Sequence, residues 1–273
     1  MRLASVGDIG TDSYVDQGIE KPGGIAFNFA IGAAKNNWEC SLISAVGTDN
    51  AGRKLRGLLP KTVLDSSHLR QIEGETANQK IKLNPDGEKQ FVGYKIGVLA
   101  KWKLTDNDLD VIVGHDAVFV PLSDGLENIF NSVAKLKGAC TKVVDFSQDY
   151  NHADFNSANN LVTRYAPDFD IIFVGGNQAL VPCVKKLSAL YPAKVFVITL
   201  GAAGSYAFYQ NTKYFQKAKP AKRIVDTTGC GDAFQSAFTT SFLNDRNVSK
   251  ALMHGAEQAL EVISYLGSTE LAL

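Results

Sequence analysis

Short apolar runs alternate with longer amphipathic segments along most of the chain. The runs are rich in β-branched and aromatic residues and end at Gly, Asp or Pro; they cover residues 3–6, 42–46, 117–120, 142–144, 171–174 and 195–199. A nearly unbroken apolar run of this length is typical of a strand buried on both faces, as in a parallel sheet between two helical layers. We therefore predict these runs as strands.

The segments between the runs have the period of helices. Helices are predicted over residues 25–36, 51–59, 126–136 and 181–190, and Asp49 stands where the N-cap of the second one belongs. Near the C-terminus, one apolar stripe with steps of four and three residues is formed by Leu252, Ala256, Ala259, Ile263 and Leu266. The repeated alternation predicts an α/β fold with a doubly wound, mostly parallel sheet flanked by helices.

Two stretches, residues 13–22 and 75–98, have a different pattern in which polar and apolar residues alternate. Asn84-Pro85-Asp86-Gly87, inside the second stretch, is a strong hairpin turn. Alternation indicates a sheet that is wet on one side, so we expect a small antiparallel lid inserted in one domain that spans residues 1–273. Such a lid would keep water from a transfer reaction. Surface hairpins without a role are the alternative.

Composition and charge exclude several classes of protein. Of the 273 residues, 28 are Lys or Arg and 28 are Asp or Glu, and this balance argues against an electrostatic grip on nucleic acid or on an anionic membrane. No apolar run approaches the roughly 20 residues of a membrane span, and the first residues do not resemble a signal peptide. The four cysteines form no CxxC pair, so we do not expect a disulfide framework. We expect a cytoplasmic location instead.

A glycine-rich stretch late in the chain has the composition of an anion site that ends in a carboxylate. It follows a short strand-like run, precedes a helical pattern, and reads Asp226-Thr227-Thr228-Gly229-Cys230-Gly231-Asp232. Glycines let backbone N–H groups converge, and the helix dipole adds partial positive charge there. The carboxylate would repel a simply bound phosphate, but it suits a base that deprotonates an acceptor hydroxyl while the amides stabilise the transferred group. A structural turn is the alternative for a lone Gly-x-Gly-Asp.

This stretch resembles the second signature of the ribokinase-like (PfkB) carbohydrate kinases, normally Asp-Thr-x-Gly-Ala-Gly-Asp. Other stretches are similar to family motifs along nearly the whole chain: residues 23–28 and 46–52 to the amino-terminal signature, 85–88 to the tip of the lid hairpin, and 199–205 to the nucleotide-binding turn. The resemblance implies ATP-dependent phosphorylation of a sugar hydroxyl, with Mg²⁺ carried on the nucleotide. No GxxxxGK[ST] motif is present, so a Walker-type kinase is excluded.

The match implies a role for each signature residue. Asp232 matches the catalytic base, and the anion hole for the transferred phosphoryl group is matched by Gly229, Cys230 and Gly231. Positions that bind the acceptor sugar are matched by Asp12, Gly24 and Asn28. Positions that contact the nucleotide are matched by Asn177, Thr199, Gly201 and Gly204. Positions that bind an activating monovalent cation such as K⁺ in some relatives are matched by Asp226 and Thr228.

Two positions depart from the family pattern. The family has Asn-x-x-Glu after a middle strand, where the glutamate helps to organise magnesium and phosphate; here Asn177 is kept and Leu180 replaces the glutamate. Either Gln178 or another carboxylate takes over that task, or the protein is a weakened enzyme. Cys230 replaces the usual alanine, either as a small residue that fills the space or as a thiol whose pKa the helix N-terminus lowers.

Within the family, the fructoselysine 6-kinase-like proteins are the most similar subgroup, on residues 91–98, 144–147 and 263–267. We therefore expect a ketose or a fructose-amine as the acceptor, phosphorylated on a primary hydroxyl because an unhindered CH₂OH reaches a buried base most easily. A nucleoside kinase and a regulatory pseudokinase that binds sugar or nucleotide are the alternatives. The exposed edge of the lid also suggests a homodimer.

Overall fold

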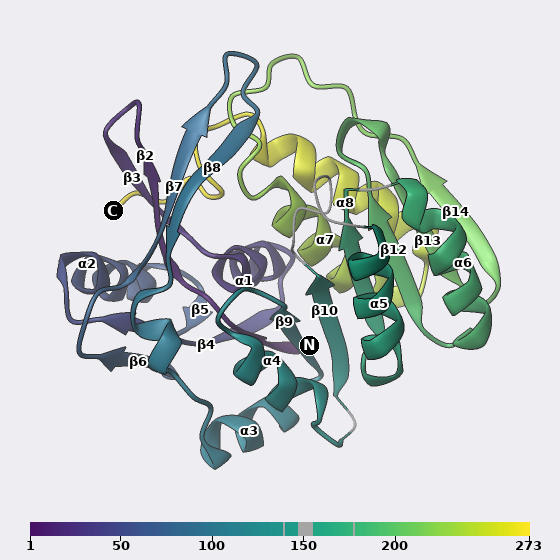
Figure 1. Ribbon diagram of the computed structural model, residues 1–273, viewed down its shortest axis with the longest axis horizontal. Helices are drawn as coiled ribbons and strands as arrows, with labels where there is room; N and C mark the ends of the chain where they lie inside the picture. The colour runs from purple at the N-terminus through teal and green to yellow at the C-terminus, as the bar shows by residue number, and fades with distance from the viewer. Residues whose placement is uncertain (139, 147–154, 177) are drawn as a thin grey trace.

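The computed structural model describes residues 1–138, 140–146, 155–176 and 178–273, and a long twisted sheet runs through its centre (Figure 1). The strand order is β14-β13-β12-β11-β10-β9-β1-β4-β5, and β6 also pairs with β4. The strands from β12 to β5 are parallel, whereas β13 and β14 are antiparallel. Their bounds are β1 Arg2–Val6, β4 Glu39–Gly47, β5 Leu64–Asp65, β6 Leu69–Ile72, β9 Ala117–Pro121, β10 Thr141–Phe146, β11 Ile171–Gly175, β12 Val195–Thr199, β13 Ser205–Tyr209 and β14 Thr212–Gln216.

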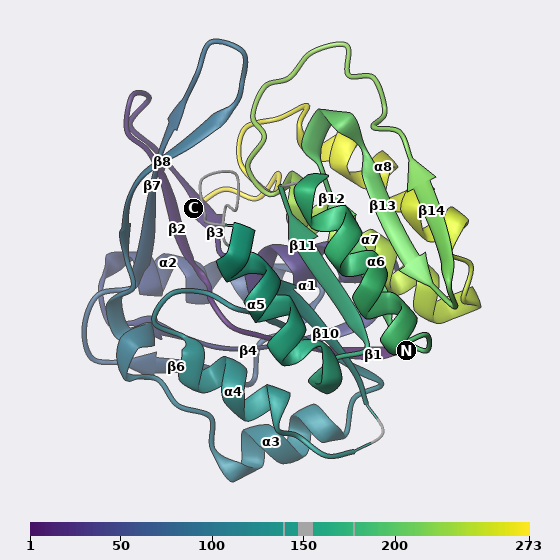
Figure 2. The same ribbon diagram turned by 45° about the vertical axis from the view of Figure 1, so that its right-hand side comes forward.

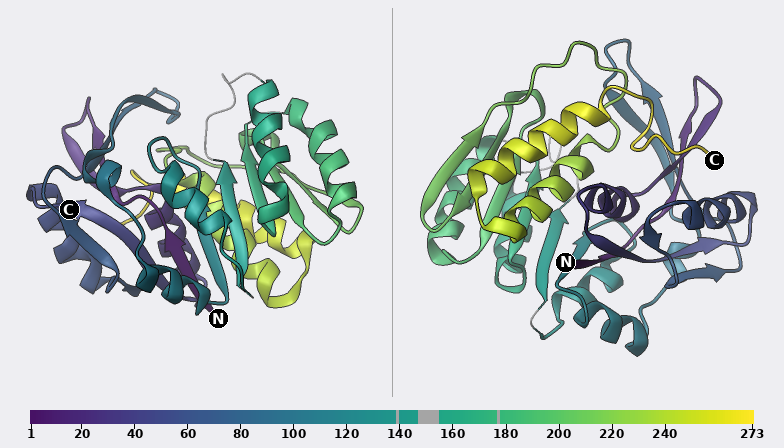
Figure 3. Two further views of the ribbon diagram at one scale, coloured as in Figure 1. Left: turned by 60° about the horizontal axis from the view of Figure 1, so that its bottom comes forward. Right: turned by 180° about the vertical axis from the view of Figure 1, so that it is seen from behind.

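Helices cover both faces of this sheet (Figure 3). They are α1 Ile25–Lys35, α2 Asn50–Leu58, α3 Asp106–Val113, α4 Glu127–Ala134, α5 Phe155–Tyr165, α6 Val181–Leu190, α7 Cys230–Asp245 and α8 Val248–Val262. Short 3₁₀ turns lie at Leu59–Lys61, Gly97–Lys101, Ala166–Asp168, Gln178–Leu180 and Gly201–Ala203. One apolar core lies under α3 to α6 and another under α1, α2, α7 and α8. The predicted doubly wound α/β fold is therefore confirmed.

The structure confirms each strand that the apolar runs predict and adds strands that the pattern misses. The missed β5 has only two residues, and β14 is an edge strand whose residues are exposed or half-buried, so neither carries an apolar run. The predicted C-terminal stripe extends too far, because α8 ends at Val262 and leaves Ile263 and Leu266 beyond it. Within the described residues, no helix is both long enough and apolar enough to cross a bilayer.

A second, four-stranded sheet projects from the end of the main sheet toward which β10 and β11 point (Figure 2). Its strands are β2 Gly10–Tyr14, β3 Ile19–Gly23, β7 Ala77–Leu83 and β8 Lys89–Lys95, in the order β3-β2-β7-β8. The predicted antiparallel hairpins β2–β3 and β7–β8 are present, and a parallel pairing of β2 with β7 joins them. The N–H of Gly87, with φ of 82°, donates to the carbonyl of Asn84 at 2.9 Å and so closes the predicted turn.

The strand register shows which side chains of the small sheet face the carboxyl end of the main sheet. Asp12 lies opposite Gln79, which lies opposite Tyr94, while Tyr14 lies opposite Ile81. Residues opposite each other share a face, and so do residues two apart on one strand. These side chains therefore face the same way as Tyr14, whose hydroxyl reaches Asp226 just before α7.

Asp49 caps α2 and ties it to β7, as the sequence predicts for the cap. Its carboxylate accepts hydrogen bonds from the N–H of Gly52 at 2.9 Å, the N–H of Thr76 at 3.0 Å and the hydroxyl of Thr76 at 2.6 Å. Burial raises the pKa of Asp49, but the donors of Thr76 and Gly52 outweigh burial and lower it overall.

We predict that Asp49→Ala lowers the free energy of unfolding by about 1–2 kcal/mol at pH 7, the usual range for a lost N-cap. A carboxyl with a lowered folded pKa stabilises the fold above its unfolded pKa and stops doing so as the pH falls through the folded value. The difference between wild type and variant should therefore shrink below about pH 4. Urea unfolding measures this difference. Asp110→Ala, at an exposed site on α3, is the control and should change little.

Candidate active site

Three carboxyl groups meet where the central parallel strands end and α7 begins. Asp8 follows β1, Asp145 is the second-last residue of β10, and Asp232 lies in the first turn of α7. Asp8 and Asp145 both act electrostatically on Asp232. Ligand sites of open α/β sheets occur at this carboxyl edge, so the position fits a binding site.

Asp232 is oriented by a short hydrogen-bond chain. The amide nitrogen Nδ2 of Asn28, on α1, donates to Oδ2 of Asp232 at 2.7 Å, and the hydroxyl of Ser268 donates to Oδ1 of Asn28 at 2.7 Å. Asp232 is half-buried, and no Lys, Arg or His among the described residues lies within ion-pair distance of it. The carboxylate therefore keeps one oxygen that neither side chain holds.

Crowding of carboxyls changes their acidity. Burial raises the pKa of Asp232 well above its usual value; the Asn28 donor lowers it, while the charges of Asp145 and Asp8 raise it further. Burial also raises the pKa of Asp145 to about 7, with a contribution from Asp8. Burial raises the pKa of Asp12 to about 7 as well, with contributions from Asp8 and Asp226. A carboxylate of raised pKa is a stronger base near neutral pH.

The loop before α7 presents backbone donors at the same place. Gly229, with φ of 77°, is the N-cap of α7, and a Cβ there would lie 2.4 Å from the Cβ of Ser268. The N–H groups of Gly231 and Asp232 find no backbone acceptor among the described residues, whereas the N–H of Ala233 bonds to Gly229. N–H groups without a backbone acceptor and the dipole of α7 make this loop suited to a phosphoryl group.

Cys230 does not behave as a thiol of lowered pKa. Burial raises its pKa, and the charge of Lys89 offsets this only in part. Desolvation outweighs the helix N-terminus, which corrects the alternative of an activated thiol and leaves the interpretation of a small residue that fills space.

The predicted acceptor-binding residues lie around the same carboxyl cluster. Asp12 is buried, and its carboxyl group occupies the space that a side chain on Gly23 would need. Among the described residues, no donor hydrogen-bonds to the Asp12 carboxyl. Gly24, with φ of 114°, is the N-cap of α1, and its carbonyl accepts from the N–H of Asn28. Asp12 therefore offers acceptor oxygens beside Gly23, close enough to Asp8 and Asp226 to be affected by their charges.

Asp226 and Thr228, matched to a cation site, are arranged differently from each other. Both carboxylate oxygens of the fully buried Asp226 accept hydrogen bonds: Oδ1 from the N–H of Thr228 at 2.8 Å, and Oδ2 from Tyr14 at 2.5 Å and from the N–H of Gly267 at 2.8 Å. By contrast, the buried hydroxyl of Thr228 has no hydrogen-bond partner, and the same holds for Thr269. The carboxylate thus holds the loop together, and the hydroxyls are the groups that remain available.

The predicted nucleotide residues lie on the turn after β12. The N–H of Leu200 bonds to the carbonyl of Gly204 at 2.8 Å, and the N–H of Gly204 bonds to Gly201 at 3.0 Å. Gly204 has φ of 99°, and a Cβ there would lie 2.3 Å from the carbonyl of Gln216. This turn is two strands away from β10 in the sheet, as is Thr199 at the end of β12. Asn177 lies outside the described residues.

Leu180 belongs to the core. It is fully buried within the apolar cluster under α3 to α6, at the start of α6. The glutamate that the family has at this position is therefore replaced by a packing residue.

The tip of the small sheet contacts the glycine-rich loop. The N–H of Thr227 donates to the carbonyl of Gly87 at 3.1 Å, and Lys89 donates through its backbone N–H to the hydroxyl of Thr227 and through Nζ to the carbonyl of Thr227. Sequence reasoning missed Lys89, Asp8, Asp145 and Ser268. Asp8 lies two residues after β1 and Asp145 is the second-last residue of β10, so their position at strand ends is a signal that would have found them. Lys89 and Ser268 reach the site only through tertiary contacts.

The carboxyl cluster predicts how stability depends on pH. A carboxyl with a raised folded pKa stabilises the fold below its unfolded pKa, and this contribution is lost as the pH rises through the folded pKa. The melting temperature of the ligand-free protein should therefore fall between about pH 5 and pH 8, since Asp145 and Asp12 have a pKa of about 7. Asp145→Asn should reduce this fall in melting temperature, whereas Asp86→Asn at the hairpin tip should leave it unchanged. Equal falls in both variants would contradict the assignment.

A glutamate at position 180, where the family pattern has one, should not improve the protein. We predict that Leu180→Glu lowers the free energy of unfolding by about 3 kcal/mol or more, because it places a carboxyl in an apolar core, and that it does not raise kcat. Gln178→Glu, at an exposed neighbouring site, should leave stability nearly unchanged. Thermal unfolding and an ADP-release assay measure the two effects. A folded Leu180→Glu protein with higher kcat would show that the position still serves metal or phosphate.

Comparison with known proteins identifies the family of the chain. The family model described as "pfkB family carbohydrate kinase" matches residues 4–123 and 153–272. The chain is 30% identical to fructosamine kinase FrlD of Bacillus subtilis (strain 168), over 98% of this chain and 93% of that protein. It is 26% identical to fructoselysine 6-kinase of Escherichia coli (strain K12), over 97% of this chain and 98% of that protein.

The fold has solved counterparts. The structure of Arabidopsis thaliana ribokinase complexed with ribose and ATP superposes with a TM-score of 0.78, at 21% identity, over 97% of this chain and 93% of that chain. The family match covers most of the chain and includes the glycine-rich loop, the carboxylate after it and the turn after β12. The chain therefore belongs to the pfkB family of carbohydrate kinases, and it is a sugar phosphotransferase.

Proposed function

We propose that this kinase transfers the γ-phosphoryl group of ATP to a primary hydroxyl of a ketose that carries an amine substituent, a fructosamine. The observation that carries the proposal is the Asp232 carboxylate, held by Asn28 beside N–H groups at the start of α7 that have no backbone acceptor. The relatives named fructosamine kinase and fructoselysine 6-kinase align over nearly the whole chain and support this acceptor class.

In the proposed reaction, Asp232 is the catalytic base. Its free oxygen takes the proton of the acceptor hydroxyl while the hydroxyl oxygen bonds to the γ-phosphorus. The bond from the γ-phosphorus to the bridging oxygen breaks, and ADP leaves with that electron pair. The N–H groups of Gly231 and Asp232 stabilise the charge on the phosphoryl oxygens during transfer, with Gly229 and Cys230 shaping the loop.

The acceptor binds between the carboxyl cluster and the small sheet. Asp12 accepts hydrogen bonds from sugar hydroxyls, and Gly24 allows the sugar to approach α1. The face of the small sheet that carries Asp12 and Tyr94 covers the sugar and acts as a lid that excludes water. The bonds from the hairpin tip to Thr227 hold this lid against the glycine-rich loop.

The nucleotide and its ions occupy the other side of the loop. The turn with Thr199, Gly201 and Gly204 contacts the nucleotide, as we propose for Asn177. Magnesium usually binds through substrate phosphates, waters and one or two carboxylates, and the described residues contain no group of three metal-ligating side chains, so the donor set suits Mg²⁺ held mainly by the phosphates of ATP. For K⁺, the unpartnered hydroxyl of Thr228 supplies a donor oxygen that Asp226 does not.

Two further proposals concern the location and the oligomeric state of the protein. A reaction that consumes ATP and a small sugar suits the cytoplasm. The strands β3 and β8 are free edges of the small sheet, and a second copy of the chain pairing there would give a homodimer.

A regulatory pseudokinase is the second candidate function, because Leu180 in the core removes the family glutamate.

We predict that Asp232→Asn lowers kcat by about 10²–10⁴-fold, the usual contribution of a general base, with little change in sugar binding. Release of ADP measures kcat, and calorimetric titration measures binding. Asp110→Asn, at an exposed site on α3, serves as the control. An unchanged kcat would show that Asp232 is not the catalytic base.

The same assay with fructose, fructosamines and nucleosides as acceptors separates the candidate functions. ADP release that depends on a fructosamine supports the proposal. Turnover of nucleosides alone would make the protein a nucleoside kinase. Sugar binding with no ADP release from any acceptor would favour the pseudokinase.

A further inference from the structure

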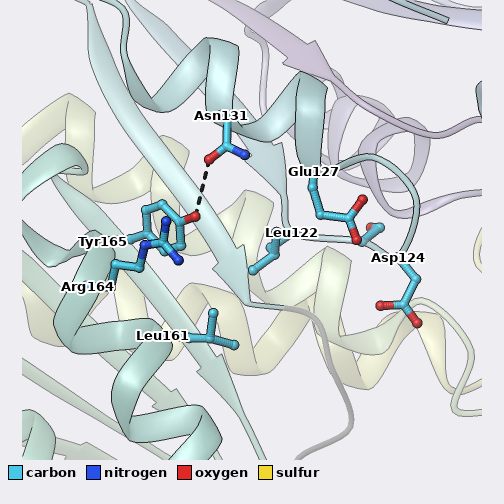
Figure 4. Close-up of a pocket in the computed structure, with 8 residues that line it drawn as sticks. Leu122, Asp124, Glu127, Asn131, Leu161, Arg164 and Tyr165 are labelled. Carbon is cyan, nitrogen blue, oxygen red and sulfur yellow. Dashed lines mark hydrogen bonds between the residues drawn. The ribbon is translucent and has the colours of Figure 1, made fainter.

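A cavity of about 340 Å³ lies between the loop after β9 and the helices α4 and α5 (Figure 4). Its lining combines apolar and charged groups. Leu122 and Leu161 supply apolar surface, while Asp124, Glu127 and Arg164 supply charges of both signs. None of these residues has a task in the proposed transfer of the phosphoryl group.

The cavity begins next to the proposed acceptor site. The N–H of Leu122 donates to the carbonyl of Asp145 at 2.8 Å, and Asp145 acts electrostatically on Asp232. A Cβ on Gly7, just before Asp8, would lie 3.1 Å from the ring of Pro121 at the end of β9. In the sheet, β9 lies between β1 and β10, whereas β12, which carries the proposed nucleotide turn, lies beyond β10 and β11. The cavity therefore adjoins the acceptor rather than the nucleotide.

Tyr94 connects the two places. It lies on the face of the small sheet that carries Asp12, and the charges of both Asp8 and Asp124 act electrostatically on its hydroxyl. The loop of the cavity also approaches the small sheet, since a Cβ on Gly125 would lie 2.3 Å from Cδ1 of Ile96, the residue after β8. A substituent that leaves the sugar in this direction would pass Tyr94 and enter the cavity.

The polar groups of the cavity match a substituent that is a zwitterion. Oγ of Ser123 is buried and has no hydrogen-bond partner. The guanidinium of Arg164 lies 5.1 Å from the ring centroid of Tyr165, and among the described residues no carboxylate is within ion-pair distance of it. One carboxylate oxygen of Glu127 accepts the N–H of Gly125 at 3.2 Å, which leaves the other for a ligand.

We infer that this cavity binds the amino-acid part of a fructosamine, an aliphatic chain that ends in an α-ammonium and an α-carboxylate. Arg164 is the specificity residue, because a guanidinium binds a carboxylate through two parallel hydrogen bonds. Glu127 binds the α-ammonium, Ser123 accepts from the secondary ammonium at C1 of the sugar, and Leu122 and Leu161 pack against the methylenes. The inference rests on the proposed function and narrows its substrate class.

The test compares two acceptors that differ only at the carboxylate: fructose linked to the ε-amine of lysine, and the same molecule with its α-carboxylate converted to the amide. ADP release gives kcat/KM for each. In the wild type the carboxylate should be preferred. Arg164→Ala should lower kcat/KM for the carboxylate about tenfold, through KM, and leave the amide unchanged. Thr163→Ala, at an exposed neighbouring site on α5, is the matched control and should change neither.

Turnover of the amide shows that each variant is folded, and Arg164→Gln serves as a second variant. Equal losses for both acceptors, or no loss for either, would overturn the role of the cavity while leaving the fructosamine kinase intact. Turnover of fructose or nucleosides but of neither lysine derivative would reject the fructosamine class itself. No ADP from any acceptor would reject the proposed function, and the cavity proposal with it.

Discussion

Burial of several carboxyl groups at one end of the sheet is the constraint around which the site is built. Asp8, Asp12, Asp145 and Asp232 influence one another, and each has a pKa raised first of all by burial. Taking like charges out of water is unfavourable unless donors compensate. The chain supplies such donors to two of these carboxyls: the N–H groups of Ile25 and Ala26 at the start of α1 bond to Asp8, and Asn28 bonds to Asp232.

Two helix N-termini therefore face the same cluster from different parts of the chain. The first belongs to α1 and is neutralised by Asp8, whereas the second belongs to α7 and keeps donors for an incoming group. Close contact of α1 with α7 brings them together: a Cβ on Gly32 would lie 2.1 Å from Oγ of Ser236. Gly32 and the small side chain of Ser236 thus allow the close approach that brings Asn28 on α1 to Asp232 on α7.

The sequence allowed prediction of the parts of the structure that are encoded locally. The apolar runs predict the central strands because those strands are buried on both faces, and the glycine-rich loop with Asp232 is a contiguous motif. The partners of Asp232 were harder to predict. Asn28 is predicted to bind the sugar, and its contact with the Asp232 carboxylate was not foreseen; Ser268, which completes this chain of hydrogen bonds, is 240 residues away from Asn28. Contacts of that kind depend on tertiary packing that no periodicity encodes.

The segment after α8 has a consequence for biosynthesis. Its Ser268 holds Asn28, its Gly267 bonds to Asp226, and its Leu271 carbonyl accepts from Lys21 on β3, so residues from both ends of the chain meet at the site. A nascent chain emerging from the ribosome can form the early strands, but it cannot complete the hydrogen-bond chain that orients Asp232 until residue 268 has emerged. A fragment released before that point would have most of the sheet but would lack the Ser268 contact that holds Asn28 against Asp232.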